Sequence, residues 1–310
     1  MGKSWLSYEQ QVDLLKKRGL EVRDPDSAVE FLSRVNYYRA SGYFRYWQRQ
    51  PGAGDNRFIE GANFEKVRQL YEAEQALVLV CDEVLHPIEV LLRTRFAHHY
   101  AEHVSAIGAF AHGEGFTQPR DPDDELVQEY VLRNLDRSKE TFVAHYRDEI
   151  KVGNHYSPDA YARMPIWVAV EAFSFGSLSR LIEASAESGV LDSLAGSMSV
   201  SRKTLPSQVR SFVYLRNRIA HCAKLWNHSV LDVPGLLPNI ATRAKKNYRP
   251  FTDHSIYKIF VALDDVATKT GIADSWLAHK VEPILQENRL LAQGIASPAK
   301  YGQFARDLLI

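Results

Sequence analysis

The sequence has few cysteines, no net charge and no long apolar run. Among its 310 residues only Cys81 and Cys222 are cysteines, which excludes a disulfide framework and fits a reducing cytoplasm. The N-terminus MGKSWLSYEQ has no apolar run after its lysine, so we expect no signal peptide. The most apolar stretch, QALVLVCDEVLHPIEVLL, contains three acids and a proline, so it predicts a buried helix. We therefore expect a cytoplasmic protein without a membrane-spanning segment.

Apolar residues recur at helical spacing along most of the chain, and no alternating pattern indicates a strand pair. The first helix is expected in 8–20, and a second follows a cap at Asp24 or Asp26. The pattern predicts further helices over 64–103 with a break or kink near Pro87, over 124–148, over 165–185 and over 206–226, and two or three more up to the C-terminus. We predict an all-α protein with an N-terminal helical region, 1–60, packed on a helical domain, 61–310.

Charge is balanced overall but not locally. Lysine plus arginine equals aspartate plus glutamate at 38 each, whereas no acid occurs between Ser193 and Leu231. That window contains six basic residues: Arg202, Lys203, Arg210, Arg216, Arg218 and Lys224. Four more follow Asp232: Arg243, Lys245, Lys246 and Arg249. Such a local positive field suits a polyanion, and a solvated basic face is the alternative.

The predicted helix over 206–226 places polar groups beside its apolar stripe. On a helical wheel Arg216 lies within the stripe, where it needs a carboxylate partner or an exit to a polar pocket. A flank about a quarter-turn away carries five polar residues: Arg210, Tyr214, Asn217, His221 and Lys224. Asn217 and His221 are four residues apart and can touch.

This residue set suits cleavage of RNA. A neutral histidine can accept the proton of a 2′-hydroxyl, arginine or lysine can stabilise charge on the phosphate, and asparagine can orient either group. No ligand cluster for a metal occurs on this helix, and we expect neither metal nor cofactor. The alternative is a structural Arg216 and an ordinary His221, because Arg93 and His98 show the same spacing.

Three further features have two interpretations each. Glu171 lies in an apolar helix and is expected to pair with Arg216 or Arg93, either structurally or to hold Arg216 in a catalytic pose. The segment NYYRASGYFRYWQRQ, which contains Arg39, suits either the core or the stacking of bases. Cys222 is expected to be a small buried residue rather than a nucleophile.

The R-N-x-x-x-H form of RNRIAH resembles the signature of the HEPN superfamily of ribonucleases. The chain as a whole resembles the abortive-infection (AbiD/AbiF-like) family of bacterial anti-phage proteins. The resemblance rests on these blocks in order: YEQQVDLLKKRGLEVRDPDSAVEFLSRVNYYRASGY, PIEVLLRT, SKETFVAHY, MPIWVAVEAFSFGSLS and LRNRIAHCAKLWN. The chain departs from the family's pattern at 74–78, where EQALV replaces an acid followed by a basic residue, so a local salt bridge is not expected there.

The resemblance implies an all-α fold on a HEPN four-helix bundle and a homodimer in which two motif helices face each other. It implies a toxin that cleaves RNA without metal, leaving 2′,3′-cyclic phosphate ends, with Arg216, Asn217 and His221 as catalytic residues. We expect RNA contacts from Arg210, Tyr214, Arg218, Lys224, Lys245, Lys246 and Arg39. The alternatives are a non-catalytic module that grips a structured or guarding small RNA, and a transferase, for which no nucleotide site is found.

Overall fold

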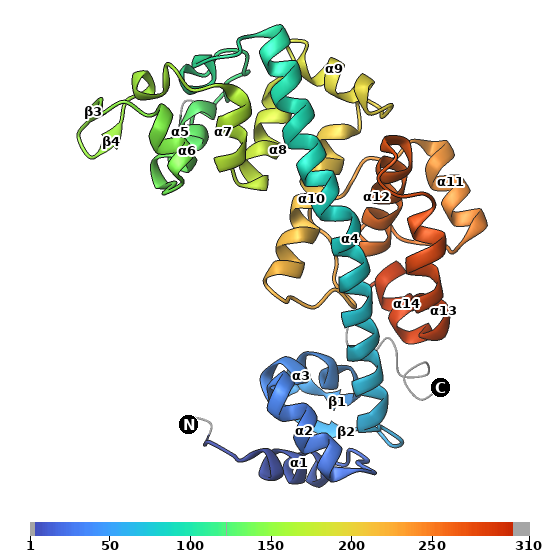
Figure 1. Ribbon diagram of the computed structural model, residues 1–310. Coiled ribbons are helices and arrows are strands. Elements are labelled where there is room, and N and C mark those ends of the chain that lie inside the picture. The colour runs from blue at the N-terminus through green and yellow to red at the C-terminus, as the bar shows by residue number, and fades with distance from the viewer. Residues whose placement is uncertain (1–3, 122, 300–310) are drawn as a thin grey trace.

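The chain is all-α, as predicted, in the computed structural model, which describes residues 4–121 and 123–299 (Figure 1). The helices are α1 (Tyr8–Lys17), α2 (Pro25–Val35), α3 (Tyr37–Phe44), α4 (Phe64–His103), α5 (Val127–Arg137), α6 (Thr141–Tyr146), α7 (Ile166–Ala172), α8 (Phe175–Ala184), α9 (Val190–Ser197), α10 (Leu205–Ala220), α11 (Pro238–Asn247), α12 (Ile256–Thr270), α13 (Glu282–Glu287) and α14 (Arg289–Ala296). A π-helical turn, Leu277–Val281, precedes α13.

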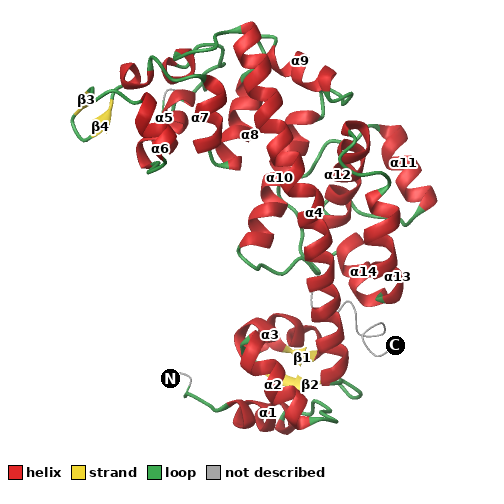
Figure 2. Ribbon diagram, viewed as in Figure 1, coloured by secondary structure: helices red, strands yellow, loops and turns green. Residues whose placement is uncertain are grey.

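Two small antiparallel hairpins are the strand pairs that the sequence pattern did not predict (Figure 2). Strand β1 (Gln48–Gln50) pairs with β2 (Asp55–Phe58), and β3 (Lys151–Val152) pairs with β4 (His155–Tyr156). Strands this short have no room for an alternating apolar pattern, so periodicity could not reveal them.

The long helix α4 is the axis of the molecule (Figure 1). Its first turn is capped by the side chain of Asn63, and the helix continues through Pro87 for 40 residues, so of the predicted break or kink the break is absent. Helices α1–α3 gather around its N-terminal end, α5–α9 around its C-terminal end, and α10–α14 around its middle. The other helices are therefore arranged around α4.

Local capping explains where several helices begin. Ser7 caps α1, and the helix stops before Gly19, whose φ of 94° is left-handed. Asp24, one of the two predicted caps, accepts the backbone N–H of Ser27 at the start of α2.

Two predicted long helices are each divided in the structure. The range 124–148 contains α5 and α6, because Ser138 takes an extended conformation at the end of α5. The range 165–185 contains α7 and α8, because Phe173 is extended and the hydroxyl of Ser174 caps the new helix by accepting the N–H of Ser177. Apolar spacing continues across both breaks, so it did not reveal them.

One hydrophobic core joins the described elements, with buried residues from Val12 in α1 to Ile295 in α14. The division into 1–60 and 61–310 stays a prediction. No helix among the described residues is long and apolar enough to span a membrane. Of the helices expected up to the C-terminus, any part in 300–310 lies outside the described residues.

The motif helix α10 occupies a central position. It packs against α8, α12 and α4, and its buried face carries Val209, Phe212 and Leu215. The opposite side of α10 opens to solvent, and there the polar flank predicted from the sequence is found.

Candidate functional site

Helix α10 ends at Ala220, six residues earlier than the sequence predicted. His221 is the C-cap residue, and Cys222 has a φ of 50°, a left-handed conformation that stops the helix. The backbone N–H of Ala223 donates to the carbonyl of Arg218 at 2.7 Å and closes the turn. His221 therefore lies at the C-terminal end of α10, where it is exposed.

Cys222 is exposed rather than buried, contrary to the prediction. The prediction rested on residue type, because a free cysteine usually behaves as a small buried apolar side chain. The left-handed turn instead directs the chain away from the α10 axis.

A groove of about 600 Å³ opens along the polar side of α10. From α10 and its cap it is lined by five of the expected residues: Arg210, Tyr214, Asn217, Arg218 and His221. The opposite wall includes Ser179, Arg180 and Glu183 of α8. The structure thus brings together Asn217, His221 and three of the expected RNA contacts.

Arg180, which the sequence analysis missed, lines this groove and a neighbouring one. The second groove, of about 800 Å³, is lined in part by Tyr130, Arg137 and Lys139, and the two share Gly176 and Arg180. The guanidinium of Arg180 lies 4.1 Å from the centroid of the Tyr130 ring. Nothing in the local sequence of α8 marks Arg180, because its role comes from the packing of α8 against α5 and α10.

The charged residues of the groove are only partly neutralised. Arg210 forms an ion pair with Glu183 at 3.1 Å, and both side chains are about half exposed. Arg218 donates to the carbonyl of Lys224 and lies 5.9 Å from the ring centroid of Tyr214. Its lining contains three arginines, Arg180, Arg210 and Arg218, and two acids, Glu183 and Asp232, so the groove carries a small net positive charge.

Tyr214 is held by a second histidine, His228, on the loop after the motif. The hydroxyl of Tyr214 and Nε2 of His228 form a hydrogen bond, and the two rings are stacked with centroids 5.9 Å apart. Burial lowers the pKa of His228 to about 4, and the positive charges of Arg218 and Lys224 act in the same direction. His228 is thus a structural support for Tyr214.

The lowered pKa of His228 predicts an acid-sensitive fold. An imidazole that is harder to protonate when folded makes the free energy of unfolding fall as pH decreases from about 6.5 to about 4, because the unfolded chain then binds more protons. We expect His228→Gln to reduce this pH dependence, measured as the urea midpoint at pH 7 and at pH 4.5. An equal decrease in wild type and variant would contradict the assignment.

Arg216 does not line the groove. Its Nε lies 3.5 Å from a carboxylate oxygen of Glu89 in α4, and its guanidinium lies 5.6 Å from the ring centroid of Phe175. Glu89 also pairs with Arg93, which in turn donates to the carbonyl of Phe173 at 2.8 Å. Glu89 is therefore shared by Arg93 and Arg216.

The expectation that Glu171 pairs with Arg216 or Arg93 is wrong. Glu171 is exposed and lines the second groove, and no ion pair of Glu171 occurs among residues 4–121 and 123–299. The prediction treated 165–185 as one helix that is apolar all round. Because α7 ends at Ala172, Glu171 lies in its last turn, where it is exposed while Ala169 and Val170 stay buried.

Lys224 is not a groove residue, contrary to the prediction. Because the helix has already ended, its side chain turns away, and its ammonium donates to the carbonyl of Gly42 at 3.0 Å. The ammonium lies 4.6 to 5.5 Å from the ring centroids of Tyr46, Trp226 and Tyr43. Burial lowers the pKa of Lys224 to about 8, and the charge of Glu74 opposes this shift.

Glu74 of α4, to which no role was assigned from the sequence, fixes the loop after His221. It is 1% exposed and accepts hydrogen bonds from the Tyr43 hydroxyl at 2.7 Å and from the backbone N–H groups of Leu225 and Trp226. Burial raises the pKa of this carboxyl, while these hydrogen bonds and Lys224 act in the opposite direction. The available signal was the helical spacing of Glu74 from Val67, Leu70, Leu77 and Cys81, which places this acid on the apolar face of α4.

The aromatic segment 36–50 is mainly core, with Tyr43, Phe44 and Trp47 buried. Arg39 is exposed and donates to the carbonyl of Cys222, so it lies beside the end of the motif helix. Lys245 and Lys246 are exposed on α11 and are not among the residues that line the groove.

Comparison with known proteins assigns the chain to a family. The family model for Abi-like proteins matches residues 30–227, a range that begins within α2 and ends after the loop held by Glu74. Searches of the curated proteins and of the solved structures found no match. The match covers more than half of the chain and includes α4, α10 and His221. The protein belongs to the Abi-like, or abortive-infection, family.

Proposed function

We propose that the protein is a metal-independent endoribonuclease of the HEPN class that acts in the cytoplasm as a toxin of abortive infection. The observation that carries the proposal is the cationic groove in which Asn217 and His221 lie together with Arg180, Arg210 and Arg218. Membership of the abortive-infection family supports the defence role. The packing of α10 against α4, α8 and α12 is consistent with a HEPN helical bundle.

In this proposal His221 accepts the proton of a 2′-hydroxyl, and that oxygen attacks the adjacent phosphorus. The bond from phosphorus to the 5′-oxygen breaks, and the leaving oxygen takes up a proton from a protonated imidazole. The products are a 2′,3′-cyclic phosphate and a 5′-hydroxyl. Asn217 positions the phosphate, and arginine stabilises charge on its oxygens in the transition state.

A homodimer completes this site. In one chain Arg216 faces Glu89 and Phe175, while His221 opens into the groove. Two copies of α10 that approach each other across a two-fold axis would supply two histidines and two arginines to one phosphate. The 32% exposure of the Arg216 side chain leaves it accessible to a second copy.

RNA contacts follow from the groove. We assign backbone contacts to Arg210, Arg218 and Arg180, and base stacking to Tyr214. Arg39 lies at the rim, and Lys245 and Lys246 are proposed as outlying phosphate contacts on α11. Lys224 is not included, because its ammonium is enclosed by aromatic rings.

Arg180→Ala is expected to weaken RNA binding and to lower the slope of log Kd against log salt by about 1, because one phosphate contact is lost. Fluorescence anisotropy with a labelled single strand at several salt concentrations measures both effects. The matched control is Arg163→Ala, since Arg163 is exposed but paired with Asp148 at 2.6 Å and lines neither groove. If both substitutions weaken RNA binding equally, the groove is not where the RNA binds.

The test of the proposed function is incubation of wild-type protein with labelled cellular RNA in EDTA, followed by mapping of the 3′ ends. Cleavage that leaves 2′,3′-cyclic phosphates supports the proposal. Tight binding without cleavage would favour the second candidate, a non-catalytic module that grips a structured or guarding small RNA. The observation in favour of that candidate is that Arg216 in the single chain is engaged by Glu89 rather than directed into the groove.

A further inference from the structure

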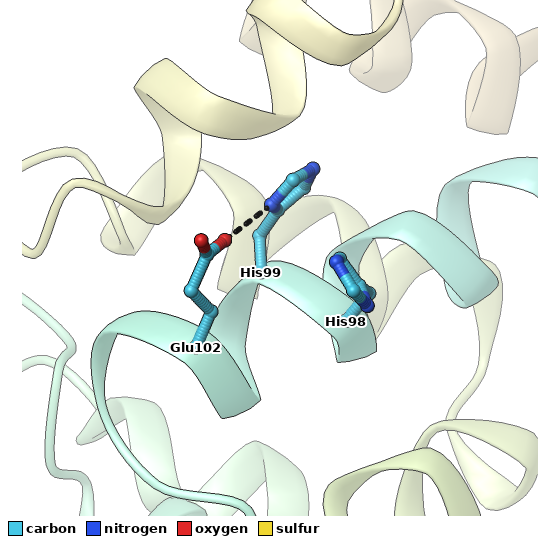
Figure 3. Close-up of side chains that lie close together, drawn as sticks. All are labelled: His98, His99 and Glu102. Carbon is cyan, nitrogen blue, oxygen red and sulfur yellow. Dashed lines mark hydrogen bonds and ion pairs between the residues drawn. The ribbon is translucent and has the colours of Figure 1, made fainter.

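Three potential metal ligands lie on one turn near the C-terminal end of α4. His98, His99 and Glu102 each offer a ligand atom, and these atoms all lie within 4.8 Å of one another. Figure 3 shows the three side chains on the same stretch of helix, with Glu102 and His99 directed toward each other. The spacing explains this arrangement, because residues three and four apart are neighbours on a helix surface.

The geometry is close to that of a bound ion. Nδ1 of His99 and a carboxylate oxygen of Glu102 are already 3.1 Å apart. Two ligands of one tetrahedral zinc ion, each at about 2.0–2.1 Å from the metal, are separated by roughly 3.4 Å. His98 lies beside His99, with ring centroids 5.0 Å apart, and its ligand nitrogen is within 4.8 Å of the other two ligand atoms.

The donor set selects the class of ion. Two imidazoles and one carboxylate suit Zn²⁺ and related transition metals, whereas Mg²⁺ and Ca²⁺ prefer oxygen ligands alone. We propose that His98, His99 and Glu102 bind one divalent transition-metal ion, with Zn²⁺ as the natural candidate. Three protein ligands leave the fourth position of a tetrahedral ion to water.

The surroundings favour a cation at this place. The cluster lies in the last two turns of α4, which ends at His103, and the C-terminal end of a helix attracts positive charge. His98 and Glu102 are exposed, which gives an ion access from solvent, while the His99 side chain is only 13% exposed and is held in place.

The site is separate from the proposed ribonuclease site. None of its residues lines the groove of His221, and its neighbour His103 is bonded to Ser193 of α9 at 2.7 Å. All three ligands belong to α4, so a bound ion would hold one turn of this helix together, without taking part in cleavage. This proposal departs from the expectation of a protein without metal, which was based on the motif helix alone.

Isothermal titration of ZnCl₂ into untagged, EDTA-treated and dialysed protein tests the proposal. The experiment uses a Cys222→Ser background, because Cys222 is an exposed thiol and thiolates are zinc ligands in general. We expect one ion per chain, and His98→Ala to weaken binding by more than about tenfold, since loss of even an outer partner of a metal ligand costs 10–100-fold. Removal of the exposed His98 imidazole should leave the melting temperature in EDTA unchanged.

His155→Ala is the matched control, because His155 is 81% exposed and lies beside a single carboxylate, that of Asp136. Zinc should raise the melting temperature of the wild type and the control, but not of the double variant His98→Ala, His99→Ala. No saturable binding, or binding unchanged in the double variant, would overturn the proposal. RNA cleavage is assayed in EDTA, so a negative zinc titration does not affect the proposed function. Absence of RNA cleavage, in turn, does not affect the proposed zinc site.

Discussion

Replacing His221 with alanine is expected to lower the rate of RNA cleavage by about 10²–10⁴-fold, the contribution typical of a general acid or base. The affinity for RNA should change little, because the cationic groups of the groove remain in place. His221 is exposed at the helix end, so the free energy of unfolding should stay within about 0.5 kcal/mol of wild type. Single-turnover cleavage of a labelled RNA in EDTA, with anisotropy for binding, separates the two effects.

The neighbouring Cys222 supplies the control for this experiment. Cys222→Ser keeps the size and the polarity of an exposed side chain next to His221, and it should cleave at the wild-type rate. If His221→Ala cleaves RNA at a rate within threefold of that of Cys222→Ser, His221 takes no part in the chemical step. A large loss in Cys222→Ser would instead indicate a thiol nucleophile, which the RNA mechanism does not use.

His221 is a cleaner probe than Arg216 because of what each side chain contacts. Arg216→Ala leaves Glu89 with Arg93 as its remaining partner, so loss of activity would be mixed with loss of stability. At His221 the backbone provides the helix cap and the side chain is free to act, so the rate reports chemistry.

The sequence was sufficient to predict the all-α class and the polar flank of α10, since both depend on spacing along one helix. Arg210, Tyr214, Asn217 and His221 do line one groove. The error at Lys224 came from the helix end, because six extra residues of assumed helix place this side chain on the wrong face. A left-handed turn at Cys222 is not favoured by its residue type, and it depends on tertiary contacts.

Ion pairs and hydrogen bonds between residues far apart in the sequence could not be predicted either. Glu171 was expected to pair with Arg216 or Arg93, whereas the structure pairs Arg216 with Glu89, on a helix more than 100 residues earlier. Both acids lie in apolar surroundings along the sequence, so burial alone did not distinguish them. The same holds for Glu74, whose three donors come from α3 and from the loop after α10.

Glu74→Ala is expected to lower the free energy of unfolding by about 3–5 kcal/mol, the cost of removing one partner from a buried charged network. The substitution leaves the N–H groups of Leu225 and Trp226 and the hydroxyl of Tyr43 without their acceptor. It also removes the negative charge that favours the Lys224 ammonium among its aromatic neighbours. Urea unfolding followed by circular dichroism measures the loss.

Glu72→Ala on the same helix is the control, because Glu72 is 61% exposed and lies 3.7 Å from Arg68, so its removal should cost no more than about 0.5 kcal/mol. Glu74→Gln keeps one acceptor oxygen for the loop and should fall between wild type and Glu74→Ala. If the loop holds His221 in place, Glu74→Gln will also cleave more slowly at a temperature where it remains folded, with RNA affinity unchanged. A loss of less than about 1 kcal/mol in Glu74→Ala would mean that Leu225 and Trp226 find other partners, and Glu74 would then have no part in positioning His221.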